Sequence, residues 1–335
     1  MTPRFFWATV GALLTAFALA PVLLSHDVYS YVDYARLGVT HGLNPYVHPP
    51  AAAPFDPAYA RVTWIDATSA YGPLFTLATY PLAWLPAWLA VAALKATAAL
   101  SVLGIAVLVA RIAPARGVSP LGAAAFVALN PLVLIQVVGG AHNDGLAMLL
   151  ATVGVAAMLS SQEANAGAAF IAAFAIKAPA AVAAPFALAS TGRAHRFLLG
   201  AAATALALGV AAYAAFGWHW LDAIGLAGEN QHRTSHMSVP TTVARLTGLD
   251  PTAVRITALL LYAALFIYLL IRTWRGMDWL RAAAWASFLL LLATAWLLPW
   301  YLIWTLPLVA LSRDRPLQLL TLALTAYQLP ARMPL

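Results

Sequence analysis

The feature that most constrains this chain is a succession of apolar runs, most of them close to the length of a membrane-crossing helix and separated by short polar hinges. About 20 apolar residues in a helix span the hydrocarbon core of a bilayer. Of 335 residues, 63% are hydrophobic and 9% are charged, whereas roughly a quarter of the residues of a soluble domain are charged. The sequence therefore predicts an all-α, polytopic transmembrane helical bundle that forms a single domain over residues 1–335.

The apolar runs predict about 10–11 membrane segments, some of them short re-entrant or interfacial helices. The first run, 5–24, also resembles a signal peptide, because Ala18-Leu19-Ala20 is an Ala-x-Ala cleavage pattern. It continues to Leu24 and is long enough for a span, so we interpret it as a transmembrane anchor. The other runs cover about 73–110, 119–138, 144–160, 166–190, 197–216, 252–271, 282–298, 300–311 and 317–334.

Arginines gather in four of the hinges, and this gives the chain an orientation. The positive-inside rule places such short basic hinges in the cytoplasm. The outer side then receives a first loop at 25–72, a second loop at 217–251 and two small hinges. Most of the 11 acidic residues and 8 histidines fall on that side, which the rule does not require and which points to a polar reaction site facing out. The basic hinges contain Arg111, Arg116, Arg193, Arg196, Arg272, Arg275, Arg281, Arg313 and Arg315.

Two of the runs do not fit a single crossing. The run 73–110 is too long for one span, so we divide it into an interfacial or re-entrant piece at 73–85 and a span from about 87. The run 166–190 predicts a short helical hairpin bent at Lys177-Ala178-Pro179, because proline breaks a helix and a lysine at membrane depth needs a cavity. A competing topology uses two spans in the first run and one in the second, and moves the hinges between them to the opposite side.

The chain contains no cysteine, which excludes a disulfide framework, a thiolate metal site and a cysteine nucleophile. His232 and His236 are spaced like zinc ligands on a helix, but no suitably placed third ligand is evident, so we expect no metal and no other cofactor. The net charge of +7 lies mainly in the basic hinges, where membrane orientation explains it. We therefore expect no nucleic-acid partner.

Acidic and aromatic residues cluster in the first outer loop, directly after the first run. Asp27 lies at the membrane boundary, where partial desolvation can raise the pKa of a carboxyl and suit it to accept a proton. Tyr29, Tyr31 and Tyr34 offer aromatic faces and hydroxyls beside it. The alternative is that Asp27 caps a helix and that the tyrosines form an interfacial belt.

A second polar cluster, Gly139-Gly140-Ala141-His142-Asn143-Asp144, opens another apolar run. Asn143 or Asp144 is a natural cap for the helix that follows. A cap accounts for one of the three polar side chains in the cluster. It leaves His142 unexplained.

Lys177 is one of only two lysines, the other being Lys95 within an apolar run. An ionisable group at membrane depth is a functional hypothesis by default, and a phosphate is a reasonable partner for Lys177. If Lys177 is unpaired, its replacement by methionine could even stabilise the protein. The segment 229–236 is rich in hydrogen-bond donors, including Arg233, although a solvated loop explains it equally well.

Several short motifs occur in a defined order along the chain: Asp27-x-Tyr29-x-Tyr31, Gly42-Leu43-Asn44-Pro45-Tyr46, Tyr71-Gly72-Pro73-Leu74, Asn130-Pro131, Gly139-Gly140-x-His142-Asn143-Asp144, Lys177-x-Pro179 and Pro299-Trp300-Tyr301. In this order they resemble the motifs of the multi-spanning GT-C type glycosyltransferases. The similarity is strongest to the bacterial polyprenol-phosphate-mannose-dependent mannosyltransferases and fainter to the catalytic subunit of the eukaryotic GPI mannosyltransferase. Larger actinobacterial members of this group are longer than this chain.

The resemblance implies an extracytoplasmic, metal-independent, inverting transfer of a sugar from a polyprenyl phosphate carrier to a hydroxyl of a glycolipid or glycan acceptor. Mannose is expected from the family likeness alone. The catalytic acidic residue of the family falls on Asp27, with Asp33 in reserve, in an enzyme of a bacterial plasma membrane. The expected ligands of the donor phosphate are Lys177, Arg233, His236 and His142, and those of the sugar or acceptor are Tyr29, Tyr31, Asn44, Tyr46, Asn143 and Asp144.

Two other classes of protein remain as alternatives. A broken hairpin with a lysine near its proline is also typical of a transporter or lipid flippase, whose site lies at the midplane between repeats. No internal repeat is visible, and a transporter need not concentrate acidic residues and histidines on one face. A non-catalytic scaffold would leave Asp27 and Lys177 without a role.

Overall fold

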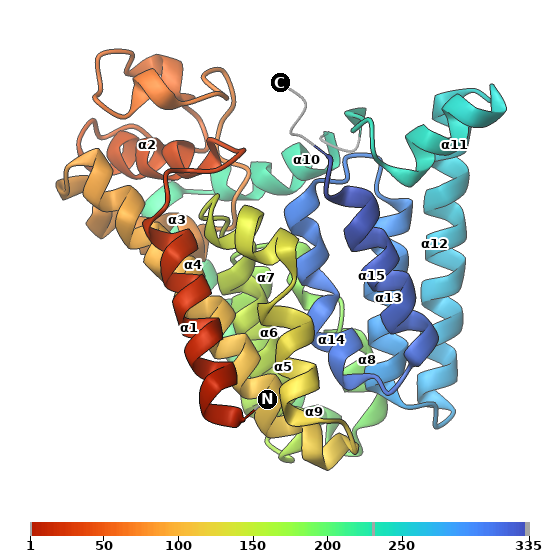
Figure 1. Cartoon of the computed structure of the whole chain (residues 1–335). Helices are drawn as coiled ribbons and strands as arrows, with labels where there is room; N and C mark the ends of the chain where they lie inside the picture. Colours follow the sequence, from red (N-terminus) through yellow and green to blue (C-terminus); the bar gives the residue numbers. More distant parts are fainter. Residues whose placement is uncertain (1, 230–231, 332–335) are drawn as a thin grey trace.

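The structure is a computed structural model that describes residues 2–229 and 232–331. Within those residues the secondary structure is entirely helical, without a β-strand (Figure 1). Three helices in this described part of the chain are long and apolar enough to cross a membrane: α4 with the turn that follows it (Ala87–Arg116), α9 (Ala194–Phe216) and α12 (Pro251–Trp274). Shorter apolar helices are α1 (Pro3–Leu19), α6 (Asp144–Leu159), η6 with α8 (Ala178–Ser190), α13 (Trp279–Ala293) and η9 with α14 (Pro299–Leu311).

Both ambiguous runs divide where the sequence predicts. The first forms a short helix, α3 (Pro73–Thr79), and a 3-10 turn, η3 (Tyr80–Trp84), before the single long helix α4 (Ala87–Ile112) begins after Pro86. The second is interrupted between α7 (Glu163–Phe174) and η6 (Ala178–Ala181), where the backbone of Lys177 is extended. The expected division and the expected break at the proline are therefore confirmed.

Other boundaries differ from the expected runs. The run 119–138 is not one continuous helix, because α5 (Pro120–Ala128) ends before Asn130 and a π-helix, η5 (Val133–Val138), follows. Pro131 lacks an N–H for helix continuation, and the side chain of Asn130 accepts the N–H of Leu132 instead. α1 likewise ends at Leu19, before Pro21, rather than at Leu24.

The two outer loops lie at the same end of the molecule, at the top of Figure 1. The first contains α2 (Asp27–Val39), η1 (Pro50–Ala52) and η2 (Tyr59–Arg61). The second contains η7 (His219–Leu221), α10 (Asp222–Glu229) and α11 (Val239–Thr247), and the last helix, α15 (Arg315–Gln328), returns to this end.

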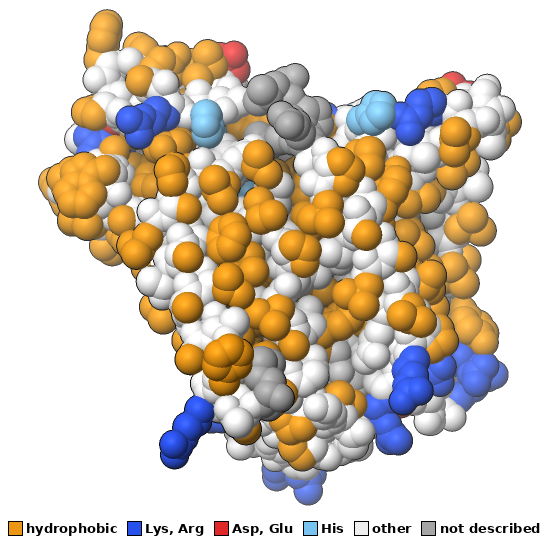
Figure 2. Space-filling view, viewed as in Figure 1, with side chains coloured by type: hydrophobic (Ala, Val, Ile, Leu, Met, Phe, Trp, Pro, Cys, Tyr) orange, Lys and Arg blue, Asp and Glu red, His pale blue; other side chains and the backbone are white. Residues whose placement is uncertain are grey.

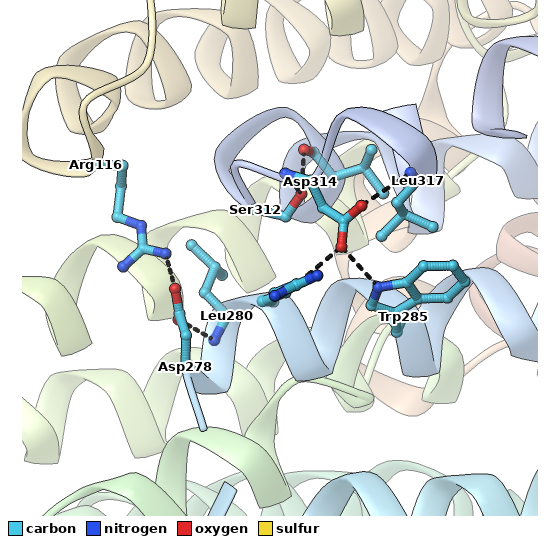
Figure 3. A network of polar contacts seen from close by, with 9 residues as sticks. Arg116, Asp278, Leu280, Trp285, Ser312, Asp314 and Leu317 are labelled. Atoms are coloured by element: carbon cyan, nitrogen blue, oxygen red, sulfur yellow. Dashed lines mark hydrogen bonds and ion pairs between the residues drawn. The ribbon is translucent and has the colours of Figure 1, made fainter. Parts of the chain in front are cut away.

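Three of the basic hinges meet at the opposite end, where Figure 2 shows basic side chains gathered; these are arginines, because both lysines of the chain lie elsewhere. Arg116 pairs with Asp278, and the Nε of Arg281 donates to Oδ2 of Asp314 at 2.8 Å (Figure 3). The indole of Trp285 donates to the same carboxylate at 2.9 Å. These contacts join the α4–α5, α12–α13 and α14–α15 hinges, so the arginines of three separate hinges share one end of the molecule.

Candidate active site

Asp27 is the first residue of α2, but its carboxylate does not cap that helix. His26 is the N-cap residue, and the cap has no side-chain hydrogen bond. Oδ1 of Asp27 instead accepts a hydrogen bond from the indole N–H of Trp64 at 3.3 Å. The N–H of Asp27 donates to Oγ of Ser25, also at 3.3 Å. The helix-cap explanation for Asp27 is therefore wrong.

Burial makes Asp27 a stronger base than an ordinary aspartate. Removal from water raises the pKa of Asp27 to about 6, although the charge of Lys177 and the hydrogen bond from Trp64 lower it. A carboxyl with that pKa is mostly ionised at neutral pH and still accepts a proton more readily than a solvated one.

Lys177 is not an unpaired charge. Its Nζ donates to Oδ2 of Asp144 at 2.8 Å, and the indole of Trp304 donates to Oδ1 of the same carboxylate at 2.6 Å. Asp144 is completely buried, so both of its oxygens are occupied within the protein. The ammonium of Lys177 also lies 5.2 Å from the ring centroid of Tyr301, which adds a cation–π contact.

His142 lies between the carboxylate of Asp27 and an aromatic wall. Its ring stacks on Trp300 at a centroid distance of 3.7 Å, and its Nδ1 is 3.8 Å from Oδ2 of Asp27. Neither ring nitrogen has a hydrogen-bond partner among the described residues. Burial, and then the charge of Lys177, lower the pKa of His142 well below its usual value, so the imidazole is neutral.

Asn143 precedes α6 as its N-cap residue, yet its side chain makes no cap hydrogen bond. Both polar atoms of that side chain are buried, and neither has a partner in the part of the chain that the structure describes. Asn143 therefore occupies the predicted N-cap position, but its side chain does not cap the helix.

A cavity of about 720 Å³ brings three of the candidate residues together, and its volume is in the usual range for ligand sites. Asp27, Lys177 and Arg233 belong to its lining. The guanidinium of Arg233 lies 4.9 Å from the ring centroid of Trp64, so Trp64 contacts both the base candidate and a residue of the second outer loop. Much of the remaining lining is apolar and comes from α7, α9, α10, α12 and α13; this part includes Ile171, Phe174, Leu208, Ile224, Leu259 and Leu290.

The Tyr71-Gly72-Pro73 motif holds the first outer loop against the segment that leads to Lys177. The N–H of Gly72 donates to the carbonyl of Ile176 at 3.1 Å, and the N–H of Leu74 donates to that of Ala175 at the same distance. A Cβ on Gly72 would lie 2.1 Å from the carbonyl oxygen of Ala175. Only glycine allows this approach, which places the two chain segments side by side at the cavity wall.

Asp33, the reserve base, lies apart from Asp27. It is buried near Arg36, His41 and Asp56, and burial followed by the charge of Asp56 raises the pKa of Asp33 to about 7. Asp56 in turn accepts from Nε of Arg36 at 2.8 Å and lies 2.8 Å from Nε2 of His41. Asp33 is not part of the cavity lining among the described residues.

The expected sugar or acceptor ligands of the first outer loop have contacts within the protein. Nδ2 of Asn44 donates to the carbonyl of Phe216 at 2.8 Å, and the hydroxyl of Tyr46 donates to the backbone carbonyl of Tyr71, also at 2.8 Å. The hydroxyl of Tyr29 accepts from Arg61 at 3.3 Å. The ring of Tyr31 is buried, and its hydroxyl has no hydrogen-bond partner in residues 2–229 and 232–331.

His236, an expected phosphate ligand, remains exposed at the surface next to the guanidinium of Arg245. It does not belong to the described cavity lining. No group of three or more histidine, aspartate or glutamate side chains in the described residues is placed to share a metal ion.

Sequence reasoning missed the tryptophans that organise the site. Trp64 donates to Asp27 and Trp304 donates to Asp144, while Trp300 stacks on His142. Trp300 stands in the Pro299-Trp300-Tyr301 motif, which could have identified it. Trp64 has no comparable local signal, because Trp218 and Trp220 also lie in an outer loop.

Comparisons of the sequence with known proteins all point to the same family. Residues 1–193 match the family described as alpha-(1->6)-mannopyranosyltransferase, N-terminal domain. The chain is 31% identical to alpha-(1->6)-mannopyranosyltransferase A of Mycobacterium tuberculosis over 334 residues, which cover 88% of this chain and 64% of that protein. It is 32% identical to the Corynebacterium glutamicum protein of the same name over 184 residues, which cover 53% of this chain and 37% of that protein. No solved structure matches.

Proposed function

Because the chain belongs to the alpha-(1->6)-mannopyranosyltransferase family, we propose that it is an inverting mannosyltransferase of the membrane. The proposed donor is mannose on a polyprenyl phosphate, and the acceptor is a hydroxyl of a glycolipid or glycan on the extracytoplasmic side. The observation that carries the proposal is the cavity that joins Asp27 and Lys177 to a mainly apolar wall. A donor with a charged phosphate and a long hydrocarbon tail needs both surfaces.

In the proposed reaction the acceptor oxygen attacks the anomeric carbon of mannose. The carboxylate of Asp27 takes the proton of the acceptor hydroxyl as the new carbon–oxygen bond forms. The bond between the anomeric carbon and the phosphate oxygen breaks, and its electron pair leaves with the polyprenyl phosphate. Lys177 and Arg233 stabilise the negative charge on the phosphate, as cationic donors do in phosphate sites.

We place His142 next to the base in this reaction rather than on the phosphate. Its neutral imidazole is 3.8 Å from Asp27 and can donate one hydrogen bond there. Only one carboxylate is needed, because the phosphate leaves without full protonation, in contrast to the sugar oxygen that leaves in a glycosidase reaction.

We place the chain as a multi-pass protein with both outer loops outside the cell. Single cysteines at two exposed alanines test this orientation without background, because the chain has no cysteine. Ala60→Cys in the first outer loop should react with a membrane-impermeant maleimide in intact cells, whereas Ala115→Cys in a basic hinge should react only after permeabilisation. The opposite pattern would reverse the orientation.

The rate of transfer should depend on pH through Asp27. The base must be ionised, so kcat should fall as pH decreases through the pKa of Asp27 near 6 and lose about tenfold per pH unit below it. The measurement is mannose transfer from pH 4.5 to 8 with saturating donor, together with a check that the protein remains folded. A profile that is flat down to pH 4.5 would contradict a base with this pKa.

The direct test of the function is transfer by the purified protein in detergent or nanodiscs. Radiolabelled mannose and glucose on polyprenyl phosphate are each offered with membrane glycolipid acceptors, and nucleotide-linked mannose serves as the alternative donor. We expect label from polyprenyl phosphate mannose to appear in the acceptor with an α linkage. The proposal would be overturned if only the nucleotide-linked donor supported transfer. It would also be overturned if the protein transferred no mannose and instead moved the intact donor lipid across the nanodisc bilayer.

A further inference from the structure

Lys95 is the second lysine of the chain, and no step of the proposed reaction uses it. It lies on α4, a helix long enough to cross the membrane, and is 3% exposed. A charged side chain at such a position is costly and is usually held by specific partners. Its Nζ donates to the carbonyl of Ala20 and, at 3.0 Å, to the carbonyl of Pro21. Among the described residues no carboxylate forms an ion pair with Lys95, so these carbonyls are what the ammonium binds.

The two carbonyls belong to the end of α1 and the start of the segment that leads to α2. Carbonyls at a helix C-terminus lack partners within the helix, and a cation there is favoured by the helix dipole. The connecting segment, residues 20–26, runs from this anchor directly to Asp27. Lys95 therefore holds the beginning of the segment whose other end carries the base.

The connecting segment is also fixed in its middle. The N–H of Leu23 donates to the carbonyl of Gly139 at 3.2 Å. A Cβ on Gly139 would lie 2.7 Å from Cδ1 of Leu23 and 2.3 Å from the carbonyl oxygen of Ile135, so the approach requires glycine. Leu24 has a φ of 59°, a conformation that a leucine keeps only where its surroundings impose it.

This second contact ties Asp27 to the rest of the site. Gly139 begins the Gly139–Asp144 turn. This turn contains His142, which lies beside Asp27, and Asp144, which pairs with Lys177. Ser25, which is buried, accepts the N–H of Asp27. The segment thus has three points of attachment: Lys95, Gly139 and the hydrogen bond within its own last turn. Together they set the distance between the carboxylate of Asp27 and the ammonium of Lys177.

We propose that Lys95 is a positioning residue that fixes the α1–α2 connection and, through it, the carboxylate of Asp27 against His142 and Lys177. This role rests on the proposed function, in which Asp27 accepts the proton of the acceptor. Displacement of a reacting group by about 1 Å can lower a rate by about 10²-fold. Lys95 is not among the described residues that line the cavity, so it should affect turnover and leave donor binding intact.

The test compares Lys95→Met with Lys95→Arg in the full-length protein. We expect Lys95→Met to lower kcat by about 10²-fold, with a donor KM within about threefold of the unsubstituted protein. Lys95→Arg keeps a cationic donor and should recover at least part of this loss. Ser101→Ala is the matched control, because Ser101 is buried on the same helix and, among the described residues, its hydroxyl bonds only to the carbonyl of Thr97. This variant should change neither parameter.

A second measurement does not depend on activity. Ser25→Cys provides a buried reporter in the connecting segment. We expect the thiol to resist a maleimide reagent when Lys95 is unchanged and to react faster when Ser25→Cys is combined with Lys95→Met. Normal kcat and continued protection of Cys at position 25 in Lys95→Met would overturn the proposal. If Lys95→Met does not fold, Lys95→Gln takes its place, with the same two measurements and the same overturning result.

The outcomes separate this inference from the proposed function. Faster labelling at position 25 in a Lys95→Met protein, together with full activity of an Asp27→Asn variant, would support the anchor and refute the catalytic role of Asp27. Loss of activity in Lys95→Met with continued protection at position 25 would refute the anchor and leave Asp27 as the base.

Discussion

Replacement of Asp27 by asparagine should reduce mannose transfer by about 10² to 10⁴-fold, which is the usual cost of removing a general base. Asparagine keeps the size of the side chain and can still accept the hydrogen bond from Trp64, but it cannot take the proton. Expression, thermal stability and donor KM should therefore stay close to those of the unsubstituted protein. The measurement is kcat for transfer from labelled polyprenyl phosphate mannose.

Asp33→Asn is the matched control for Asp27→Asn, because both aspartates are buried on α2 and only Asp27 lines the cavity. We expect Asp33→Asn to retain transfer. Loss of transfer in Asp33→Asn with normal transfer in Asp27→Asn would move the base to Asp33 and keep the class of enzyme. Normal transfer by both variants would refute a single-carboxylate mechanism in this loop.

Replacement of Lys177 by methionine should both destabilise the protein and weaken its use of the donor. The structure pairs Lys177 with a completely buried Asp144, so methionine would leave that carboxylate without its cation. Breaking a buried pair in this way costs about 3–5 kcal/mol of folding free energy. Loss of a charge-assisted hydrogen bond to the donor phosphate should raise the donor KM by about 10 to 100-fold. Thermal unfolding in detergent and donor kinetics measure the two effects.

The double variant Lys177→Met with Asp144→Asn separates these two roles of the lysine. Because asparagine carries no charge, most of the lost stability should return, while the donor KM should remain high. Recovery of normal donor KM in the double variant would show that Lys177 acts only as the partner of Asp144. Unchanged stability in Lys177→Met would contradict the buried ion pair.

Local patterns in the sequence predicted much of the fold. Apolar runs determine which segments are helical, since every backbone polar group in a bilayer must be satisfied within its own segment. Pro86 and Pro179 mark the boundaries that the structure confirms, because proline ends a helix by its own geometry. Asn130-Pro131 carries the same signal and was not used, so the run 119–138 was wrongly expected to be continuous.

The sequence also singled out the ionisable residues of the site, and for a physical reason. A charge at or near membrane depth is costly wherever its partner lies, so Asp27 and Lys177 stood out by their positions at the end of one apolar run and within another. Asp33, Asn44 and Tyr46 share the composition of the same loop, but none of the three is among the described residues that line the cavity. A loop without helical or strand periodicity contains no local rule for which side chains face inward.

Local patterns along the chain therefore account for the helix content, the principal breaks and the costly charges. The partner of each charge is set by the packing of the helices. Lys177 and Asp144 are 33 residues apart, Asp27 and Trp64 are 37, Lys95 and Ala20 are 75, and Asp144 and Trp304 are 160. Propensity and periodicity act over one or two helical turns, whereas these pairings depend on how whole helices pack. The protonation behaviour of Asp27 and the position of its carboxylate follow from that packing.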